Sequence, residues 1–259
     1  MSRAVSFVYW SMALLVAVIM FPIAVMILLV TLPFDRRRAV LHQFTCLWAS
    51  IYTWWSPVWS VSVRGREHIE RGKTYVVVAN HQSTVDIFSL HRLFWHFKWV
   101  AKEAMFKMPL IGWNMHLNRY IPIRRGDRNS VVEMFARCRE ALGQGSSVVL
   151  FPEGTRSQDG NLLPFKPGAF ELAREAGMPI LPVVIQGTLR ALPPYGFTVS
   201  RARIRVNVLP AWPVERVQAL SVEELTEQIR DQMAAYLVDE PWPPARGAAD
   251  DSTTASPPR

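Results

Sequence analysis

The first long apolar segment of the chain lacks charged side chains altogether. Residues 4–34 contain no Asp, Glu, Lys or Arg. A helix of about 29 residues would reach ~44 Å, which exceeds the ~30 Å hydrocarbon core of a bilayer. The segment is also too long for the hydrophobic region of a signal peptide. The pattern therefore predicts a membrane helix, and Pro22 near its middle predicts a kink or a break.

A second apolar segment, residues 41–59, is rich in Trp and Tyr, which are typical of the membrane–water interface. Two arrangements remain open: a spanning helix followed by an interfacial helix, or a two-helix hairpin that enters one leaflet. Arg36, Arg37 and Arg38 follow the first segment, and Arg3 precedes it. By the positive-inside rule, the rest of the chain is expected on the cytoplasmic face of the membrane. In a bacterium this membrane would be the inner membrane.

From about residue 60 onward, short β-rich runs alternate with helical patterns. The continuous apolar runs 76–78 and 148–151 are typical of strands that are buried on both faces of a sheet. We therefore expect an α/β fold with a largely parallel sheet of about seven strands flanked by helices. The expected strands are residues 59–65, 74–80, 97–102, 118–124, 146–152, 179–186 and 202–210.

Three capping-box patterns predict where helices begin. Ser83-x-x-Asp86, Ser130-x-x-Glu133 and Ser221-x-x-Glu224 each place a hydroxyl three residues before a carboxylate. A fourth helix is expected to end at Gly177, which suits the position after a helix C-terminus. The expected helices are residues 84–95, 131–143, 168–177 and 222–238.

The chain is thus expected to have three parts. Residues 1–59 would form a membrane anchor of two helices, and residues 60–240 the α/β domain. The stretch 241–259 is rich in Pro, Ser and Ala and is expected to be disordered.

Composition narrows the possible partners. The formal net charge of +8 favours an anionic partner, for which nucleic acid and anionic lipid are both candidates. No nucleic-acid fold signature is present, so a membrane surface is the expected partner and nucleic acid is not. Cys46 and Cys138 are the two cysteines, without a CxxC pair, so neither a disulfide framework nor a metal site is predicted.

The stretch "NHQSTVD" contains His81 and Asp86 directly after a predicted strand. One interpretation is structural, because Asp86 would complete a cap on the following helix. The other is catalytic, because α/β sheets place their sites at the carboxyl ends of strands. Asp86 would then accept the Nδ1–H of His81 and leave Nε2 as a base. From these residues alone both interpretations remain open.

A second polar cluster, "FPEGTRS", follows the predicted strand at 146–152. An ordinary Pro/Gly turn with a surface arginine would explain it. An acid and an arginine beside a glycine also suit a polyol phosphate, since arginine binds phosphate with two hydrogen bonds and a carboxylate accepts hydroxyl groups. The candidate binding residues here are Glu153, Gly154, Thr155, Arg156 and Ser157.

Taken in order along the chain, four blocks resemble the motifs of the glycerophospholipid acyltransferases, specifically the 1-acylglycerol-3-phosphate acyltransferases. "NHQSTVD" and "FPEGTRS" are similar to the first and third motifs, "YIPIRRGDR" (120–128) to the second, and "ILPVVIQG" (180–187) to the fourth. The resemblance covers roughly residues 60–210 and implies the glycerol-3-phosphate acyltransferase fold.

The resemblance also implies a role for three further basic residues. It places the functional arginine of the second motif at Arg125 and a phosphate-binding lysine at Lys166 in "FKPGAF". The family often has Asp before that arginine, whereas this chain has Arg124, so either arginine is a candidate to face the substrate. A solvated basic loop is the alternative interpretation.

The implied reaction moves an acyl group from a thioester to the free sn-2 hydroxyl of 1-acylglycerol-3-phosphate and gives phosphatidic acid. His81 would be the general base and Asp86 would orient it. The expected partners are the lysophospholipid, the bilayer with its anionic lipid, and acyl-CoA or acyl-ACP as cosubstrate, with no other cofactor and no metal. Two alternatives stay open: the same chemistry on another acceptor, such as another lysophospholipid or a lyso-aminolipid, and a membrane-anchored lipid-binding protein without activity.

Overall fold

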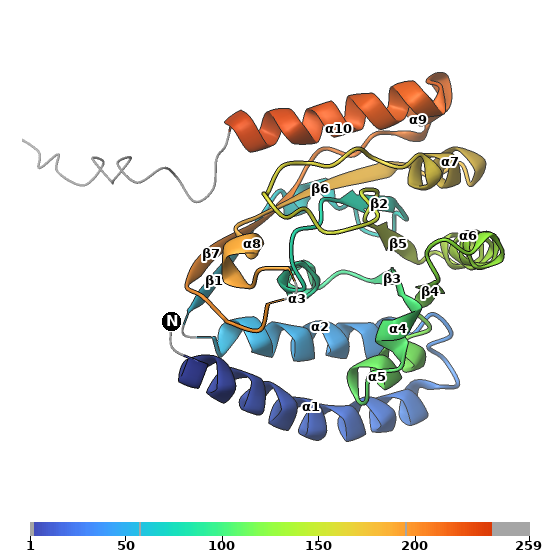
Figure 1. The fold of residues 1–259 in the computed structure, drawn as a ribbon. Helices are drawn as coiled ribbons and strands as arrows, with labels where there is room; N and C mark the ends of the chain where they lie inside the picture. Colours follow the sequence, from blue (N-terminus) through green and yellow to red (C-terminus); the bar gives the residue numbers. More distant parts are fainter. Residues whose placement is uncertain (1–2, 57, 195, 240–259) are drawn as a thin grey trace, which may run out of the picture.

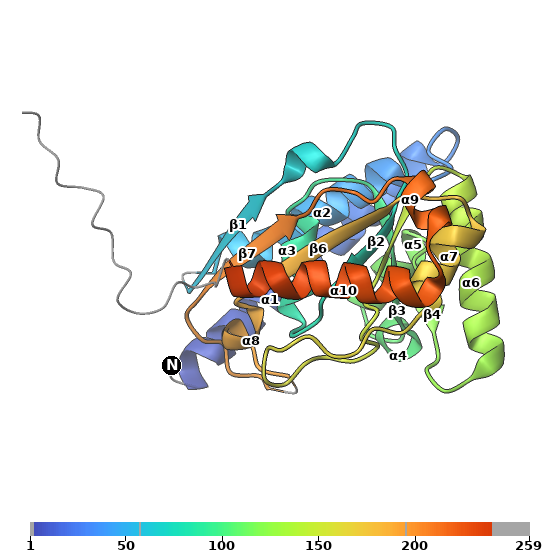
Figure 2. The same cartoon turned by 90° about the horizontal axis from the view of Figure 1, so that it is seen from above.

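The computed structural model describes residues 3–56, 58–194 and 196–239, so the expected tail at 241–259 lies outside the described residues (Figure 1). Within them, seven strands form one sheet in the order β1-β7-β6-β2-β5-β3-β4. Every neighbouring pair is parallel except β6 with β7. The expected α/β fold is therefore confirmed, and Figure 2 shows the strands running side by side from β1 to β4. The strands are β1 (Trp59–Arg64), β2 (Val76–Ala79), β3 (Phe97–Lys102), β4 (Ile121–Ile123), β5 (Ser147–Leu150), β6 (Ile180–Gln186) and β7 (Ala202–Val208).

The continuous apolar runs are buried on both sides of the sheet, as their sequence predicts. All four residues of β2 are buried. Val76 and Val78 belong to the core on one face, while Val77 and Ala79 belong to the core on the other. This division follows from the two-residue period of a strand. Helices therefore cover both faces, which separates the central strands from water.

The helices form a layer on each face of the sheet. On one face lie α6 (Arg128–Gly143), α7 (Gly168–Glu175), α9 (Val214–Ala219) and α10 (Val222–Asp239). On the other lie α3 (Val85–His91), α4 (Glu103–Phe106) and α5 (Ile111–Leu117). Two short helices complete the domain, η1 (Arg66–His68) and α8 (Thr188–Ala191).

Two of the helix boundaries predicted from the sequence need correction. Helix α3 is shorter than the expected 84–95, because the chain turns at Phe94, which has a φ of 47°, before β3 begins. Helix α6 begins at Arg128 because Asp127 caps it by accepting bonds from the N–H groups of Asn129 and Ser130. The hydroxyl of Ser130 instead accepts a bond from the N–H of Arg124 at 2.8 Å, so the capping box predicted there is wrong.

The other two helix signals are confirmed. At the start of α10, the Ser221 N–H donates to the Glu224 carboxylate at 2.9 Å, and the Glu224 N–H donates to the Ser221 hydroxyl at 3.2 Å. These reciprocal bonds are the predicted capping box. After α7, Gly177 has a φ of 60°, and the Met178 N–H donates to the Ala173 carbonyl at 2.9 Å. Such a 6→1 bond around a left-handed glycine ends a helix.

The N-terminal segments form two long helices, α1 (Arg3–Thr31) and α2 (Ala39–Trp54), which pack side by side (Figure 1). Helix α1 is continuous through Pro22, so the expected break is absent. Helix α2 lies between α1 and the α/β domain (Figure 1). Its side chains Leu41 and Trp48 are buried, which makes α2 part of the packed protein as well as a partner of α1.

Helix α1 is apolar on both of its sides, although only one side has a protein partner. Small residues such as Ala17 and Ala24 are buried in the cluster shared with α2 and α5. One window of the helix, within residues 4–31, has a mean hydropathy of 3.1 and is only 11% buried. An uncovered apolar surface of this extent is a candidate for membrane anchoring. Its exposed residues include Phe7, Val8, Leu14, Leu15, Val18, Ile19, Met26, Leu29 and Val30.

Candidate active site

The centre of the candidate site is a hydrogen-bonded pair formed by His81 and Asp86. His81 follows the carboxyl end of β2, and Asp86 lies in the first turn of α3. The Nδ1 atom of His81 lies 2.7 Å from the Oδ2 atom of Asp86. Asp86 is fully buried, whereas the His81 side chain is 13% exposed. Nε2 of His81 has no hydrogen-bond partner among the described residues, so it is available to a substrate.

Asp86 also holds the backbone that carries the histidine. Its Oδ2 atom accepts the N–H groups of Gln82 at 2.7 Å and Ser83 at 2.8 Å. The bond from the Ser83 N–H is one half of the predicted capping box, in which a carboxylate accepts the N–H of the residue three positions earlier. The two interpretations of "NHQSTVD" are therefore compatible: the same oxygen organises the start of α3 and orients the imidazole.

One face of the imidazole ring packs against an aromatic side chain. His81 stacks on Phe151 with 4.0 Å between the ring centroids and an interplanar angle of 13°. Phe151 directly follows β5, the strand next to β2. Sequence reasoning did not assign Phe151 to the site, although its place at the end of a buried strand beside the glutamate motif was a usable signal.

Glu153 supports the pair by accepting hydrogen bonds from backbone N–H groups. One carboxylate oxygen accepts the N–H of His81 at 2.7 Å and the other accepts the N–H of Leu163 at 3.0 Å. Burial raises the pKa of Glu153, while the two backbone N–H groups act in the opposite direction. The carboxylate therefore positions His81 directly.

The rest of the "FPEGTRS" loop lies against the first motif. The N–H of Ser157 donates to the carbonyl of His81 at 2.8 Å, and its hydroxyl donates to Asp159 at 2.9 Å. These contacts give Ser157 a positioning role. Arg156 donates to the Thr84 hydroxyl at 3.2 Å, which places its guanidinium group beside the segment that joins His81 to Asp86.

Gly154 and Lys166 lie in contact on the same loop. Gly154 has a φ of 68°, and a β-carbon there would come within 2.9 Å of the Nζ and Cε atoms of Lys166. Glycine is thus favoured by the backbone conformation, while a larger residue would also displace the end of the Lys166 side chain. Thr155, between Gly154 and Arg156, is exposed. The structure therefore brings a lysine and an arginine to the loop that carries Glu153.

The two arginines of the second motif have different surroundings. Arg124 donates to Glu103 at 3.0 and 3.1 Å and to Asp127 at 3.0 Å. Arg125 is exposed, and no ion pair or hydrogen bond of its side chain is present in the described part of the chain. Both follow β4, which is three strands from β2, or roughly 14 Å at ~4.8 Å per strand. Arg125 is therefore the less constrained of the two arginines.

Asn80 is a further polar residue of the site that sequence reasoning missed. It is buried at the end of β2, where its Nδ2 donates to the Ile185 carbonyl at 2.9 Å. Its Oδ1 accepts the Ile185 N–H at 2.7 Å. These two bonds hold β2 to β6 exactly one residue before His81, at a point where the sheet ladder ends. The signal was available, because a buried Asn after a strand needs partners for its amide.

His42 and His91 belong to a buried cluster next to the site, because Trp99 stacks on Phe151 and donates a hydrogen bond to His91. Ligand atoms of His42, Cys46 and His91 lie within 4.8 Å of one another. All four ring nitrogens already have hydrogen-bond partners, and burial lowers the pKa of His91 to about 4. The histidines therefore act as neutral structural partners. Those partners are Tyr120 and Trp95 for His42, and Ile87 and Trp99 for His91.

Comparison with known proteins identifies the class to which this fold and site belong. The family model described as Acyltransferase matches residues 60–186, a range that contains the His81–Asp86 pair, both arginines of the second motif and the Glu153 loop.

Individual relatives define the family more closely. A 1-acyl-sn-glycerol-3-phosphate acyltransferase of Chlamydomonas reinhardtii is 39% identical over 241 residues, which are 92% of this chain and 70% of the relative. A chloroplastic 1-acyl-sn-glycerol-3-phosphate acyltransferase of Brassica napus is 41% identical over 162 residues, which are 62% of this chain and 46% of the relative. The chain belongs to the 1-acyl-sn-glycerol-3-phosphate acyltransferase family. It spans about half the length of the Brassica napus relative.

A solved structure shares the fold. The crystal structure of the 1-acyl-sn-glycerophosphate acyltransferase PlsC from Thermotoga maritima is similar with a TM-score of 0.67 and 24% identity. The similarity covers 89% of this chain and 97% of that one, so it extends beyond the residues matched by the family model.

Proposed function

We propose that the chain transfers a fatty acyl group from an acyl thioester to the sn-2 hydroxyl of 1-acylglycerol-3-phosphate and releases phosphatidate. The observation that carries this proposal is the 2.7 Å bond between His81 Nδ1 and Asp86 Oδ2, which leaves Nε2 unpartnered within the described structure. The names of the relatives supply the acceptor, because they describe 1-acylglycerol-3-phosphate acyltransferases.

The chemistry follows from the geometry of the pair. A hydroxyl group is a weak nucleophile at neutral pH, so His81 Nε2 removes its proton as the oxygen attacks the thioester carbonyl carbon. The carbon–sulfur bond then breaks, and the proton passes from the imidazolium to the departing thiolate. Asp86 stabilises the imidazolium through Nδ1 while that charge exists. A general base of this kind contributes about 10²–10⁴-fold to the rate.

The basic residues around the pair fit the charge of the acceptor. Arg125, Arg156 and Lys166 would bind the phosphate, because guanidinium and ammonium groups donate charge-assisted hydrogen bonds to phosphate oxygens. Arg124 is held by Glu103 and Asp127, which favours Arg125 over Arg124 for this role. Acyl-CoA and acyl-ACP both present the same thioester, so either is a candidate donor.

The position of α1 supports an anchor that lies within one leaflet. The Val199 N–H donates to the Ser6 hydroxyl at 3.1 Å, and Trp10 Nε1 donates to the Phe197 carbonyl at 2.8 Å. Near the other end, Leu28 packs in the cluster with α2 and α5. Because α1 is docked along its length, crossing the bilayer would carry charged domain surface into hydrocarbon. A hairpin embedded in the cytoplasmic leaflet keeps the uncovered side of α1 in lipid and the arginines that follow it at the headgroups.

The test is acyl transfer by the detergent-purified full chain from labelled acyl-CoA and acyl-ACP to four acceptors: lysophosphatidate, glycerol 3-phosphate, lysophosphatidylglycerol and lysophosphatidylethanolamine. Transfer to lysophosphatidate that is lost in His81→Ala supports the proposal. His68→Ala is the matched control, because His68 bonds the Val208 carbonyl at the end of β7, which is two strands from β2. Transfer to another acceptor alone would retain the base and change the substrate. Equal activity in wild type and His81→Ala would remove the catalytic assignment.

A further inference from the structure

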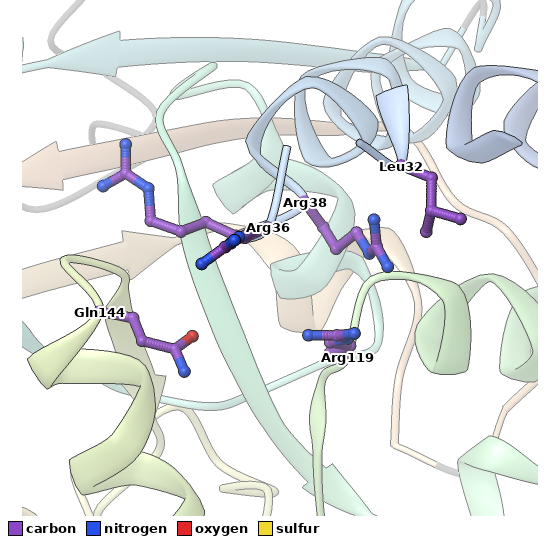
Figure 3. Close-up of a pocket in the computed structure, with 6 residues that line it drawn as sticks. Leu32, Arg36, Arg38, Arg119 and Gln144 are labelled. Carbon is purple, nitrogen blue, oxygen red and sulfur yellow. The ribbon is translucent and has the colours of Figure 1, made fainter. Parts of the chain in front are cut away.

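A cavity lined by arginines lies beside the loop that joins α1 to α2. Its volume is about 560 Å³ (Figure 3). Figure 3 shows the Arg38 and Arg119 side chains near one another, with Leu32 on one side and Gln144 on the other. No carboxylate lines it. We call this cavity the arginine pocket, and its lining residues are Leu32, Arg36, Arg37, Arg38, Arg119 and Gln144.

The arginine pocket is separate from the candidate active site. Arg119 precedes β4 and Gln144 precedes β5, so both lie at the amino ends of their strands. His81 instead follows the carboxyl end of β2. Trp10, which packs in one cluster with Val85 beside the catalytic pair, is about 22 residues from Leu32 along α1, or roughly 33 Å. The pocket therefore needs an explanation of its own.

A buried lysine holds the two loops that form the pocket. Lys98 Nζ donates to the carbonyl of Arg37 at 2.7 Å and to the carbonyl of Asn118 at 2.6 Å. These carbonyls belong to the residues directly before Arg38 and Arg119. Both of those arginines have a left-handed backbone, with φ values of 60° and 54°. Such conformations are unfavourable for residues other than glycine and persist where the surrounding structure imposes them.

The positive charge of the pocket is only partly balanced by the protein. Asp35 is close enough to act on Arg38 and Lys98, but it is one carboxylate against the four arginines of the lining. The carboxylate of Asp35 is occupied by the N–H groups of Ala39 at 2.7 Å and Val40 at 2.9 Å. Arg37 and Arg38 each donate to a backbone carbonyl. Within the described residues none of the four guanidinium groups forms an ion pair. Arg38 is only 6% exposed, and its Nε has no hydrogen-bond acceptor there. A buried donor without an acceptor indicates a missing partner.

We propose that the arginine pocket binds the phosphate group of an anionic phospholipid from the surrounding leaflet, as a lipid site distinct from the catalytic one. Several guanidinium groups around one cavity match a phosphate, since each offers a fork of N–H donors. The apolar wall identifies the source of that phosphate. Leu32 lines the pocket, and Leu29 and Phe34 beside it are exposed, so the acyl chains of the same lipid can lie along the uncovered side of α1.

The test is lipid binding to the full chain in neutral detergent, measured by native mass spectrometry with phosphatidylglycerol and with phosphatidylcholine of the same acyl chains. One saturable phosphatidylglycerol site is expected, and phosphatidylcholine should not occupy it. In Arg36→Gln/Arg119→Gln the affinity for phosphatidylglycerol should fall about tenfold or more, because two charge-assisted donors are lost. Arg137→Gln/Arg139→Gln removes the same charge from exposed positions on α6 and should change the affinity by less than about twofold.

Three results would overturn the proposal. Equal loss in both double variants would mean that the lipid responds to net charge alone. Displacement of phosphatidylglycerol by inorganic phosphate at low millimolar concentration would make the pocket a site for free phosphate. Loss of acyl transfer in neutral micelles by Arg36→Gln/Arg119→Gln, with normal binding of phosphatidylglycerol, would place these arginines on the substrate path. Arg38→Lys adds a variant that keeps the charge and removes the fork, and it should weaken lipid binding while leaving acyl transfer in neutral micelles unchanged.

Discussion

Replacing Asp86 with Asn separates its catalytic role from its role as a helix cap. In the native protein Oδ2 accepts three N–H groups, from His81, Gln82 and Ser83, at 2.7–2.8 Å. Oδ1 is buried without a hydrogen-bond partner in the described structure. An Asn of the same shape keeps one acceptor oxygen there, but it places an amide N–H₂ where Oδ1 was.

The stability cost can be worked from these contacts. A buried unsatisfied donor costs about 1–3 kcal/mol, and bonds to a neutral oxygen are weaker than bonds to a carboxylate by about 1 kcal/mol each. The sum, about 4–6 kcal/mol before relaxation, is smaller than the stability of most domains in the typical range of about 5–15 kcal/mol. The variant is therefore expected to fold with a reduced midpoint of denaturation.

The catalytic effect should be larger and of a different kind. Without the carboxylate the imidazolium loses its counter-charge, because the amide oxygen that remains at the Oδ2 position accepts the Nδ1–H but carries no negative charge. Since a general base is worth about 10²–10⁴-fold, kcat should fall by about that factor with little change in KM. In a His81→Ala background the same substitution should have no further effect on kcat, because Asp86 acts through His81.

Ser83→Ala is the matched control for stability. The Ser83 hydroxyl donates to the Leu192 carbonyl at 2.6 Å and accepts the Val85 N–H at 3.2 Å, so its loss destabilises the same turn. The N–H of Ser83 that binds Asp86 is retained. If Asp86→Asn and Ser83→Ala show the same loss of stability and the same kcat, the catalytic role of Asp86 is refuted.

Three further predictions concern the residues around the pair and the arginine pocket. Arg125→Ala should raise the KM for lysophosphatidate about tenfold or more in steady-state kinetics, whereas Arg124→Ala should lower stability slightly and leave KM unchanged; the reverse result would assign the phosphate to Arg124. Glu153→Gln should lower kcat without raising KM, because the amide cannot accept the N–H groups of both His81 and Leu163; a higher KM alone would make Glu153 a substrate ligand. Burial lowers the pKa of Lys98 to about 7, so between about pH 7 and 9 the unfolded chain binds more protons and stability should rise with pH. Lys98→Met should flatten that rise in denaturation curves, and an unchanged slope would contradict it.

The sheet could be predicted from the sequence because its signal is local. Runs such as 76–78 are apolar at every position, which requires cover on both faces, and all seven expected strands are present. The capping box at Ser221 was equally local. The wrong start of α6 has a different cause. Asp127 and Ser130 are both residue types that cap a helix N-terminus. Asp127 is the cap here, because the Ser130 hydroxyl instead accepts a hydrogen bond from the Arg124 N–H.

The candidate site could be predicted only in part. The pairing of His81 with Asp86 depends on five residues of chain, so the spacing was sufficient to suggest it. The role of Glu153 depends on a contact across 72 positions, between strands that become neighbours only when the sheet forms. The arginine pocket has the same character, because Arg38 and Arg119 meet only after α2 has docked on the domain. The sequence shows which residues carry charge, and the fold decides which of those charges meet.

Helix α1 links the candidate active site to the arginine pocket. Helix α1 packs near the catalytic pair at its N-terminal end, through Tyr9 and Trp10, and ends at the arginine pocket. Because the helix is docked along its length, its uncovered apolar side fixes the depth of both regions together. A phospholipid phosphate in the arginine pocket would then hold the far end of α1 at the headgroup level, which keeps His81 at the depth where a lysophospholipid presents its hydroxyl. On this argument, loss of the pocket should reduce activity in anionic vesicles while leaving it unchanged in neutral micelles, where depth has no meaning.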